Sequence, residues 1–141
     1  MDEAAIAIIH IRVERADGEL RATRKLIEDG LYRIACTRAY YAAFLMTTAV
    51  LLTLDVARTK HSGVEAAFHE QFIRGARIEA EYGRLYALLR KTREDSDYNE
   101  SDSHRGHGSS ASGRRRAFCR PAGAVLARSE SSRVIPSFAA D

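Results

Sequence analysis

Apolar residues recur every three or four positions in four separate segments of the first hundred residues, which is the spacing of an amphipathic helix. The segments span residues 5–28, 32–54, 62–74 and 78–97. Short links that contain Gly or Asp join them, and short links force neighbouring helices to reverse direction. The pattern therefore predicts an all-α fold, an antiparallel four-helix bundle.

The second segment, 32–54, is rich in Ala and aromatic residues and is apolar around much of its circumference, which predicts the central helix. Ile34, Tyr41 and Leu45 mark its expected inner face. Arg38 falls on the same face, and a guanidinium is costly to bury alone, so Arg38 needs a carboxylate, a phosphate or a wet cleft. An acidic residue of a neighbouring helix is the plain alternative to a binding role.

Ser62 and Glu65 have the spacing of a capping box at the start of the third helix. Ser62 is expected to accept a hydrogen bond from the Glu65 amide, while the Glu65 side chain reaches back to the Ser62 amide. A capping box would explain the His-Ser-Gly motif at 61–63 by its structural role, so that no catalytic role is required. The inner positions expected in the third and fourth helices are Val64, Ala67, Phe68, Phe72, Ile78, Tyr82, Leu85 and Leu89.

The composition indicates one small domain, because 141 residues suffice for a single core but not for two comfortable ones. The chain begins with acidic residues, and the apolar run 4–9 is too short for a signal peptide or a membrane span. Cys36 and Cys119 have neither metal-binding nor redox spacing. We therefore expect reduced thiols, a cytoplasmic location, no membrane partner, no metal and no cofactor.

The net charge of +3 divides unevenly along the chain. Residues 1–100 carry 15 Lys and Arg against 16 Asp and Glu, whereas residues 101–141 carry seven Arg against three acids. The helical period also stops near residue 101, and Ser, Arg and Gly dominate beyond it. Two explanations stay open for 101–141: a disordered basic tail, or an out-of-frame translation of a GC-rich gene.

Three motifs, in order, resemble those of the HEPN domain family of small helical prokaryotic proteins. They are Arg-Ala-Tyr-Tyr-Ala-Ala-Phe at 38–44, Lys-His-Ser-Gly-Val at 60–64 and Asp-Tyr at 97–98. The resemblance covers about residues 6–100 and is closest to the family's short single-domain branch. It implies a helical bundle over residues 1–100, here without the fifth helix that usually closes it.

The resemblance also implies a chemistry, since many HEPN proteins are metal-independent ribonucleases, often toxins, with an Arg and a His on one helix. In this branch six residues separate the two, which places the pair at Arg38 and position 45, and position 45 is Leu45. Acid–base catalysis contributes roughly a hundred- to ten-thousand-fold, so its loss leaves feeble cleavage at most. His61, at the start of the third helix, is the substitute imidazole that we consider.

Arg38, Tyr41, Asp97 and Tyr98 are the candidate residues for binding RNA or a nucleotide. The resemblance further implies a homodimer and a nucleotidyltransferase-type antitoxin as partners. Three function classes therefore stay open: a dimeric HEPN scaffold that binds RNA, a nucleotide or a protein partner; a HEPN endoribonuclease toxin that uses Arg38 and His61 as catalytic residues; and a plain helical interaction module. The scaffold is preferred, because Leu45 disfavours the ribonuclease.

Overall fold

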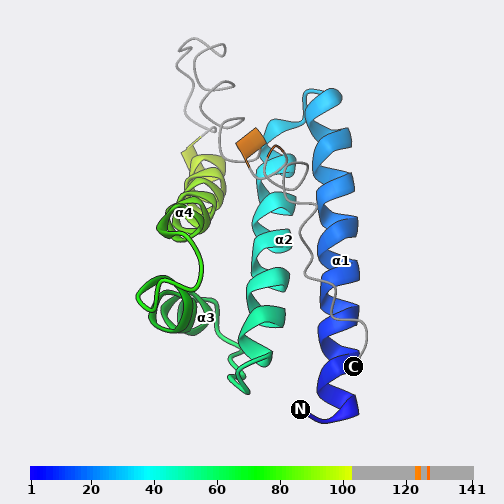
Figure 1. Ribbon diagram of the computed structural model, residues 1–141. Helices are drawn as coiled ribbons and strands as arrows, with labels where there is room; N and C mark the ends of the chain where they lie inside the picture. The colour runs from blue at the N-terminus through cyan, green and yellow to red at the C-terminus, as the bar shows by residue number, and fades with distance from the viewer. Residues whose placement is uncertain (103–122, 125–126, 128–141) are drawn as a thin grey trace.

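The computed structural model describes the backbone of residues 1–102, 123–124 and 127, and the side chains of the same residues except 96–102 (Figure 1). Its elements are α1 (Glu3–Glu28), α2 (Tyr32–Leu52), α3 (His61–Phe68), the π-helix η1 (His69–Ile73) and α4 (Ala80–Asp102). The described residues contain no strand, which confirms the predicted all-α bundle. The proposed tail, 101–141, lies almost entirely outside the described residues.

Helices α1 and α2 form an antiparallel hairpin (Figure 1). Asp2 caps α1, because its carboxylate accepts a hydrogen bond of 2.6 Å from the Ala5 amide. Gly30 follows the end of α1 with a φ of 75°, a left-handed conformation that glycine adopts without strain. The reversal that the Asp-Gly pair predicted is therefore confirmed.

Helix α2 is the centre of the bundle, because it packs against α1 on one side and against α3 and α4 on the other (Figure 1). Its length would also suit a membrane span, and so would the mean hydropathy of 1.3 of an 18-residue window within it. Half of that apolar window is buried inside the protein, however, so packing against the other helices accounts for its composition.

The inner face predicted for α2 is wrong, because the buried side of the helix is formed by other positions. Ile34 is 47% exposed, and Arg38 is exposed beside it. The closest packing instead uses small residues, with Ala35, Ala39 and others fully buried. A helix that is apolar around most of its circumference does not reveal its inner side by period, and alanines, which let two backbones approach closely, mark that side better than Ile34 does.

Two buried clusters hold the other helices on α2. One joins Cys36 and Tyr40 to Tyr86 and Leu89 of α4, and the second joins Leu51 to the α3 and η1 residues Val64, Ala67, Phe68 and Phe72. The inner positions predicted for the third helix are confirmed, since all four are buried. In α4 Leu89 is fully buried, while the other predicted positions are half-buried.

The predicted capping box is wrong. Helix α3 begins one residue earlier, with Lys60 at its N-cap and no side-chain cap, and Ser62 lies inside the helix. Glu65 does not reach back along α3, because its carboxylate is paired with Arg90 of α4. A charged partner from another helix has displaced a local hydrogen bond that is worth about 1 kcal/mol.

Candidate functional site

A cleft of about 740 Å³ opens where α2, α3 and α4 meet. The side chains that carry its chemistry are Tyr40, His61, Glu65, His69, Arg90 and Arg93. They come from four elements, α2, α3, η1 and α4. The cleft therefore brings imidazole, guanidinium, carboxylate and phenol groups together in the fold.

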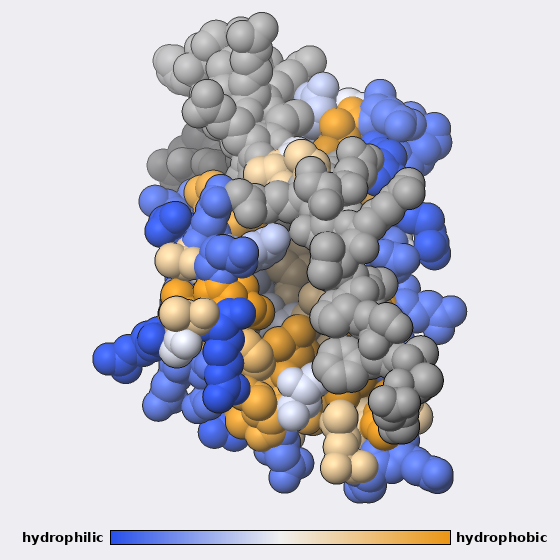
Figure 2. Space-filling view, viewed as in Figure 1, coloured by the Kyte–Doolittle hydropathy of each residue, from blue (hydrophilic) through white to orange (hydrophobic). Residues whose placement is uncertain are grey.

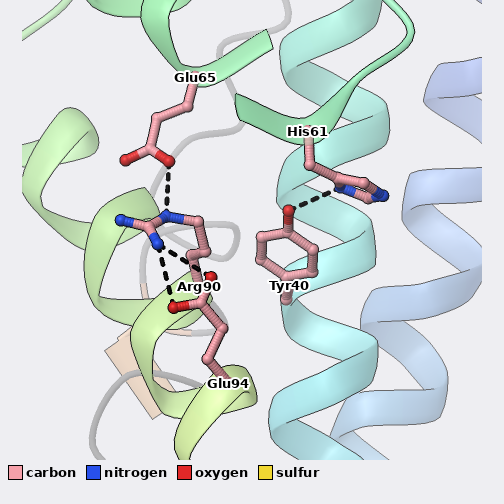
Figure 3. Close-up of polar contacts among 5 residues, drawn as sticks. All are labelled: Tyr40, His61, Glu65, Arg90 and Glu94. Carbon is pink, nitrogen blue, oxygen red and sulfur yellow. Dashed lines mark hydrogen bonds and ion pairs between the residues drawn. The ribbon is translucent and has the colours of Figure 1, made fainter. Parts of the chain in front are cut away.

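Tyr40 and His61 form a hydrogen-bonded pair at one end of the cleft (Figure 3). The Tyr40 hydroxyl lies 2.7 Å from Nδ1 of His61, and Tyr40 has no exposed surface. Burial is the main cause that raises the pKa of Tyr40 above its ordinary value of 10.0, so the phenol keeps its proton. Which of the two groups donates in this hydrogen bond depends on the tautomer of His61.

A second phenol, Tyr86 of α4, lies behind this pair. Its ring stacks on that of Tyr40 with 5.9 Å between centroids, and its hydroxyl is buried without a well-aligned hydrogen bond to any described residue. Burial first, and the neighbouring Tyr40 next, raise the pKa of Tyr86 well above its ordinary value. Both phenols therefore stay neutral.

Arg90 of α4 lies between two carboxylates (Figure 3). Its Nε is 2.6 Å from Glu65 of α3, and one terminal nitrogen is 2.9 and 3.0 Å from the two carboxylate oxygens of Glu94. The hydrogen bond that Arg90 donates to Glu94 is the largest cause that raises the pKa of Arg90, followed by the charge of Glu65. Arg90 is thus neutralised, and it ties α3 to α4.

Arg93, one turn further along α4, lies over aromatic rings of α2. Its guanidinium carbon is 5.2 Å from the centroid of the Tyr40 ring and 5.5 Å from that of Tyr41. Such cation–π contacts orient the guanidinium of an arginine over the rings. The two adjacent tyrosines, which lie about 100° apart around the helix, share this cation.

His69 is held at the other end of the cleft by an unusual backbone. It is the first residue of η1, and its carbonyl accepts from the Arg74 amide five residues later, at 2.8 Å. Gly83 of α4 makes room for it, since a Cβ there would lie 2.7 Å from Cε1 of His69. Single π turns occur frequently at functional sites, and this one turns an imidazole towards the cleft.

The predicted binding residue Arg38 lies elsewhere. Its side chain is 48% exposed, and one guanidinium nitrogen is 3.4 Å from both carboxylate oxygens of Glu19 on α1. The acidic neighbour that sequence analysis considered is therefore present, although it did not single out Glu19. Exposed pairs of this kind contribute about 1 kcal/mol or less, so the contact leaves Arg38 easy to redirect.

Arg38 and His61 are not brought together within one chain. His61 binds Tyr40, and Arg38 precedes Tyr40 by two positions, which is about 200° around a helix. Tyr41 is half-buried and points between the directions of Arg38 and Tyr40. Leu45 points almost the same way as Arg38. Asp97 and Tyr98 belong to α4, but their side chains lie outside the described residues.

Sequence reasoning missed Arg90, Arg93 and His69 as members of one cleft. The available signal was the pair of arginines three positions apart near the end of a helix, since such residues share a face. Nothing in the sequence shows that this face meets Tyr40. Among the described residues, no three His, Cys, Asp or Glu side chains come together as a metal site.

Comparison with known families decides what kind of bundle this is. The model of the HEPN domain matches residues 9–120. The chain belongs to the HEPN domain family. The resemblance seen in the three sequence motifs is thus confirmed, and the helical architecture agrees with it.

Several HEPN relatives are similar to this chain. A Methanocaldococcus jannaschii protein named "Putative toxin MJ0605" is 39% identical over 90 residues, which are 64% of this chain and 67% of the relative. A Thermotoga maritima protein named "UPF0332 protein" is 33% identical over 93 residues, 66% of this chain and 70% of the relative. A second M. jannaschii protein, "Putative toxin MJ0142", is 31% identical over 87 residues, 62% and 59% of the two chains.

Proposed function

We propose that this HEPN protein is a dimeric, toxin-like helical module that binds RNA or a nucleotide through the Arg38 face of α2. The observation that carries the proposal is the state of Arg38 itself. Its guanidinium is half-exposed, and its contacts among the described residues are those of 3.4 Å to Glu19. Two relatives are named putative toxins, which supports a toxin-like role.

A phosphate is a better partner for Arg38 than the surface carboxylate that it now touches. Guanidinium groups bind phosphate through two parallel hydrogen bonds, and such charge-assisted bonds are roughly twice as strong as neutral ones. The Glu19 pair costs little to separate, because both groups remain in contact with water after separation. Arg38 is therefore suited to exchange its carboxylate for an RNA phosphate.

Dimerisation would place two Arg38 side chains near one another. Leu31, Ile34 and Met46 of the α2 region are between 38 and 48% exposed. Apolar surface also gathers over the later part of α2 and over α3, between polar flanks (Figure 2). A self-complementary pair is the commonest way to cover such a surface. A nucleotidyltransferase-type protein is the antitoxin that we propose as its further partner.

Leu45 is the reason to propose binding rather than rapid cleavage. It lies seven residues after Arg38, which is nearly two helical turns, so the two point almost the same way. A leucine neither gives nor takes a proton. Without an imidazole there, the Arg38 face has a group that stabilises phosphate charge but none that performs acid–base catalysis.

The test compares the wild type, Arg38→Ala and Leu45→His on one labelled RNA without added metal. We expect the wild type to bind without brisk cleavage, Arg38→Ala to lose binding, and Leu45→His to gain cleavage. Arg33→Ala is the matched control, because it removes the same charge from another side of α2. Rapid wild-type cleavage that depends on Arg38 would overturn the proposal.

The second candidate is a metal-independent ribonuclease that uses the α2–α3–α4 cleft. It is favoured by one observation: His61 and His69 line the same cleft as Arg90 and Arg93. The same assay in the presence of EDTA separates the two candidates. Cleavage that disappears in His61→Ala and persists in Arg38→Ala would establish the second candidate and contradict the first.

A further inference from the structure

Arg12 of α1 is a half-buried cation that has no carboxylate partner among the described residues. One terminal nitrogen of its guanidinium donates to the backbone carbonyl of Thr48 on α2, at 3.1 Å. A guanidinium stays charged, whereas a carbonyl carries no net charge. Half-burial therefore costs Arg12 part of its hydration without an opposite charge in return.

The other arginines that the structure pairs across helices differ in this respect. Arg90 of the cleft lies between two carboxylates, and Arg38 touches one. A guanidinium has five N–H groups, and the hydrogen bond to Thr48 uses one of those on Arg12. An anion that reaches this part of α1 would thus meet a cation that no described carboxylate neutralises.

Arg12 lies on the same side of the α1–α2 hairpin as Arg38. On α1, Arg12 and Glu19 are seven residues apart, which is nearly two full turns, so they point almost the same way. Their partners on α2, Thr48 and Arg38, follow in the opposite order, as antiparallel helices require (Figure 1). The two arginines therefore stand at the two ends of one line of contacts between α1 and α2.

The distance between the two ends decides what kind of ligand can use both. Ten positions of α2 separate Arg38 from Thr48, which is about 15 Å at a rise of about 1.5 Å per residue. Tyr41 and Leu45 lie between them and are half-buried. A single phosphate cannot reach both arginines, whereas a strand that rises about 3.4 Å per nucleotide covers this distance with four or five nucleotides.

The charges of α1 favour a polyanion on this side of the helix. Arg15 follows Arg12 by three positions and is exposed, so two cations share the side. The acids Glu14, Asp17 and Glu28 are also exposed but point about 140° or more away from Arg12. Positive charge is therefore concentrated on one side of α1, although residues 1–100 carry slightly more acids than bases.

We propose that Arg12 is a second phosphate-binding residue of the Arg38 face and that this face takes an RNA strand rather than a free nucleotide. The inference rests on the function proposed above, because Arg38 holds the first phosphate. Arg12 holds another phosphate of the same strand, about 15 Å away along α2. Tyr41 and Leu45 lie under the bases between the two contacts, where an aromatic ring and an apolar side chain suit unpaired bases.

The experiment measures the affinity of the full-length protein for uridine monophosphate and for uridine oligonucleotides of two, four and eight units, at several salt concentrations. We expect the affinity to rise steeply up to about four or five units, the length that reaches both arginines. Each phosphate contact with a single strand adds about 0.7 to the slope of log affinity against log salt. Arg12→Gln should therefore lower this slope by about 0.7 and weaken binding of the longest oligonucleotide about tenfold or more.

Two further variants separate a phosphate contact from a structural role. Arg12→Lys keeps the charge and should keep the wild-type slope. Arg21 is exposed on the same helix and lies nine positions from Arg12, which is the opposite side, so Arg21→Gln should change neither slope nor affinity. Thermal melting shows whether each variant is folded. The length series uses the wild type alone and tests the strand whatever Arg12→Gln does to the fold.

The inference is overturned if Arg12→Gln leaves the slope and the oligonucleotide affinity unchanged, or if it weakens the monophosphate as much as the longest oligonucleotide. In either case, loss of RNA binding in Arg38→Ala leaves the proposed function standing. Equal affinity of the wild type for the monophosphate and the longest oligonucleotide also contradicts the strand. If Arg38→Ala binds every probe as the wild type does, the proposed function fails, and the shared strand fails with it.

Discussion

At the scale of single residues, α2 places two functional candidates in opposite environments. Tyr40 is fully buried and hydrogen-bonded to His61, whereas Arg38 is half-exposed and touches Glu19 at 3.4 Å. Sequence reasoning placed Arg38 on the inner face of the helix, which is wrong, and did not single out Tyr40 as the partner of His61. A buried tyrosine with a polar partner serves both the core and the site, because its ring fills the core while its hydroxyl orients the imidazole.

Buried phenols make the stability of the fold sensitive to alkaline pH. Burial raises the pKa of Tyr40 and of Tyr86 above the ordinary 10.0, so the unfolded chain releases these protons before the folded chain does. The stabilisation is complete below about pH 10 and is lost as the pH rises above it, with a slope of about 1.4 kcal/mol per pH unit for each phenol. Urea unfolding between pH 8 and 11 measures this slope.

The variant Tyr86→Phe tests which group is responsible. It should reduce the alkaline slope, because one of the two phenols no longer titrates. Its unfolding free energy at pH 8, where tyrosines keep their protons, separates any packing change from the titration. An unchanged slope in Tyr86→Phe would show that other groups cause the pH dependence.

At the scale of helices, the sequence predicted which elements exist better than it predicted how they end. The four periodic segments are all helical, because a long amphipathic pattern outweighs local preferences. The start of α3 was wrong because Glu65 binds Arg90, a partner that is 25 positions away and is not visible in a local motif. The π turn at His69–Ile73 was missed for the same reason, since Gly83 of α4 makes space for it.

Gly83 gives a test of that contact between elements. Alanine favours a helix over glycine by about 1 kcal/mol, but a Cβ at position 83 would lie 2.7 Å from His69 and 3.2 Å from Ile73. We expect Gly83→Ala to destabilise the protein by about 1–3 kcal/mol, as overpacking does. Chemical denaturation measures the change in the free energy of unfolding.

Two matched variants support the interpretation of Gly83→Ala. In a His69→Ala background the same substitution should become neutral or stabilising, because the nearest atom has been removed. Gly18→Ala in α1 should stabilise by up to about 1 kcal/mol, since the nearest atom to its Cβ is a flexible Arg21 nitrogen at 3.8 Å. A stabilising Gly83→Ala in the wild-type background would contradict the tight contact.

At the scale of the whole molecule, α2 separates two surfaces with different chemistry. One contains Arg38 with the exposed Ile34, and the other is the cleft that α3 and α4 complete. The sequence predicted the bundle and its central helix, but it did not separate these surfaces. Such a separation depends on the rotation of α2 between its neighbours, which an almost uniformly apolar helix does not encode by period.

The proposed homodimer is tested by a charge placed on each surface. Ile34→Glu should raise the dissociation constant of the dimer about tenfold or more, because an apolar contact is replaced by a carboxylate that resists burial. Leu88→Glu on α4 is the control, since Leu88 is 46% exposed and Ile34 is 47% exposed. Sedimentation velocity over a concentration series distinguishes them. Dissociation by Leu88→Glu alone would assign the interface to α4 instead.

The missing cap of α3 has a consequence for the order in which the protein folds. Helix α3 and the η1 turn that continues it are together short enough to be marginal in water, and α3 has no side-chain cap because its N-cap residue, Lys60, offers no acceptor. Glu65 of α3 is instead paired with Arg90 of α4. Helix α3 becomes stable only after α4 has docked, whereas the long α1–α2 hairpin is built from neighbouring segments and forms early. In hydrogen exchange, the amides of α3 should therefore open by local unfolding, well before those of α2.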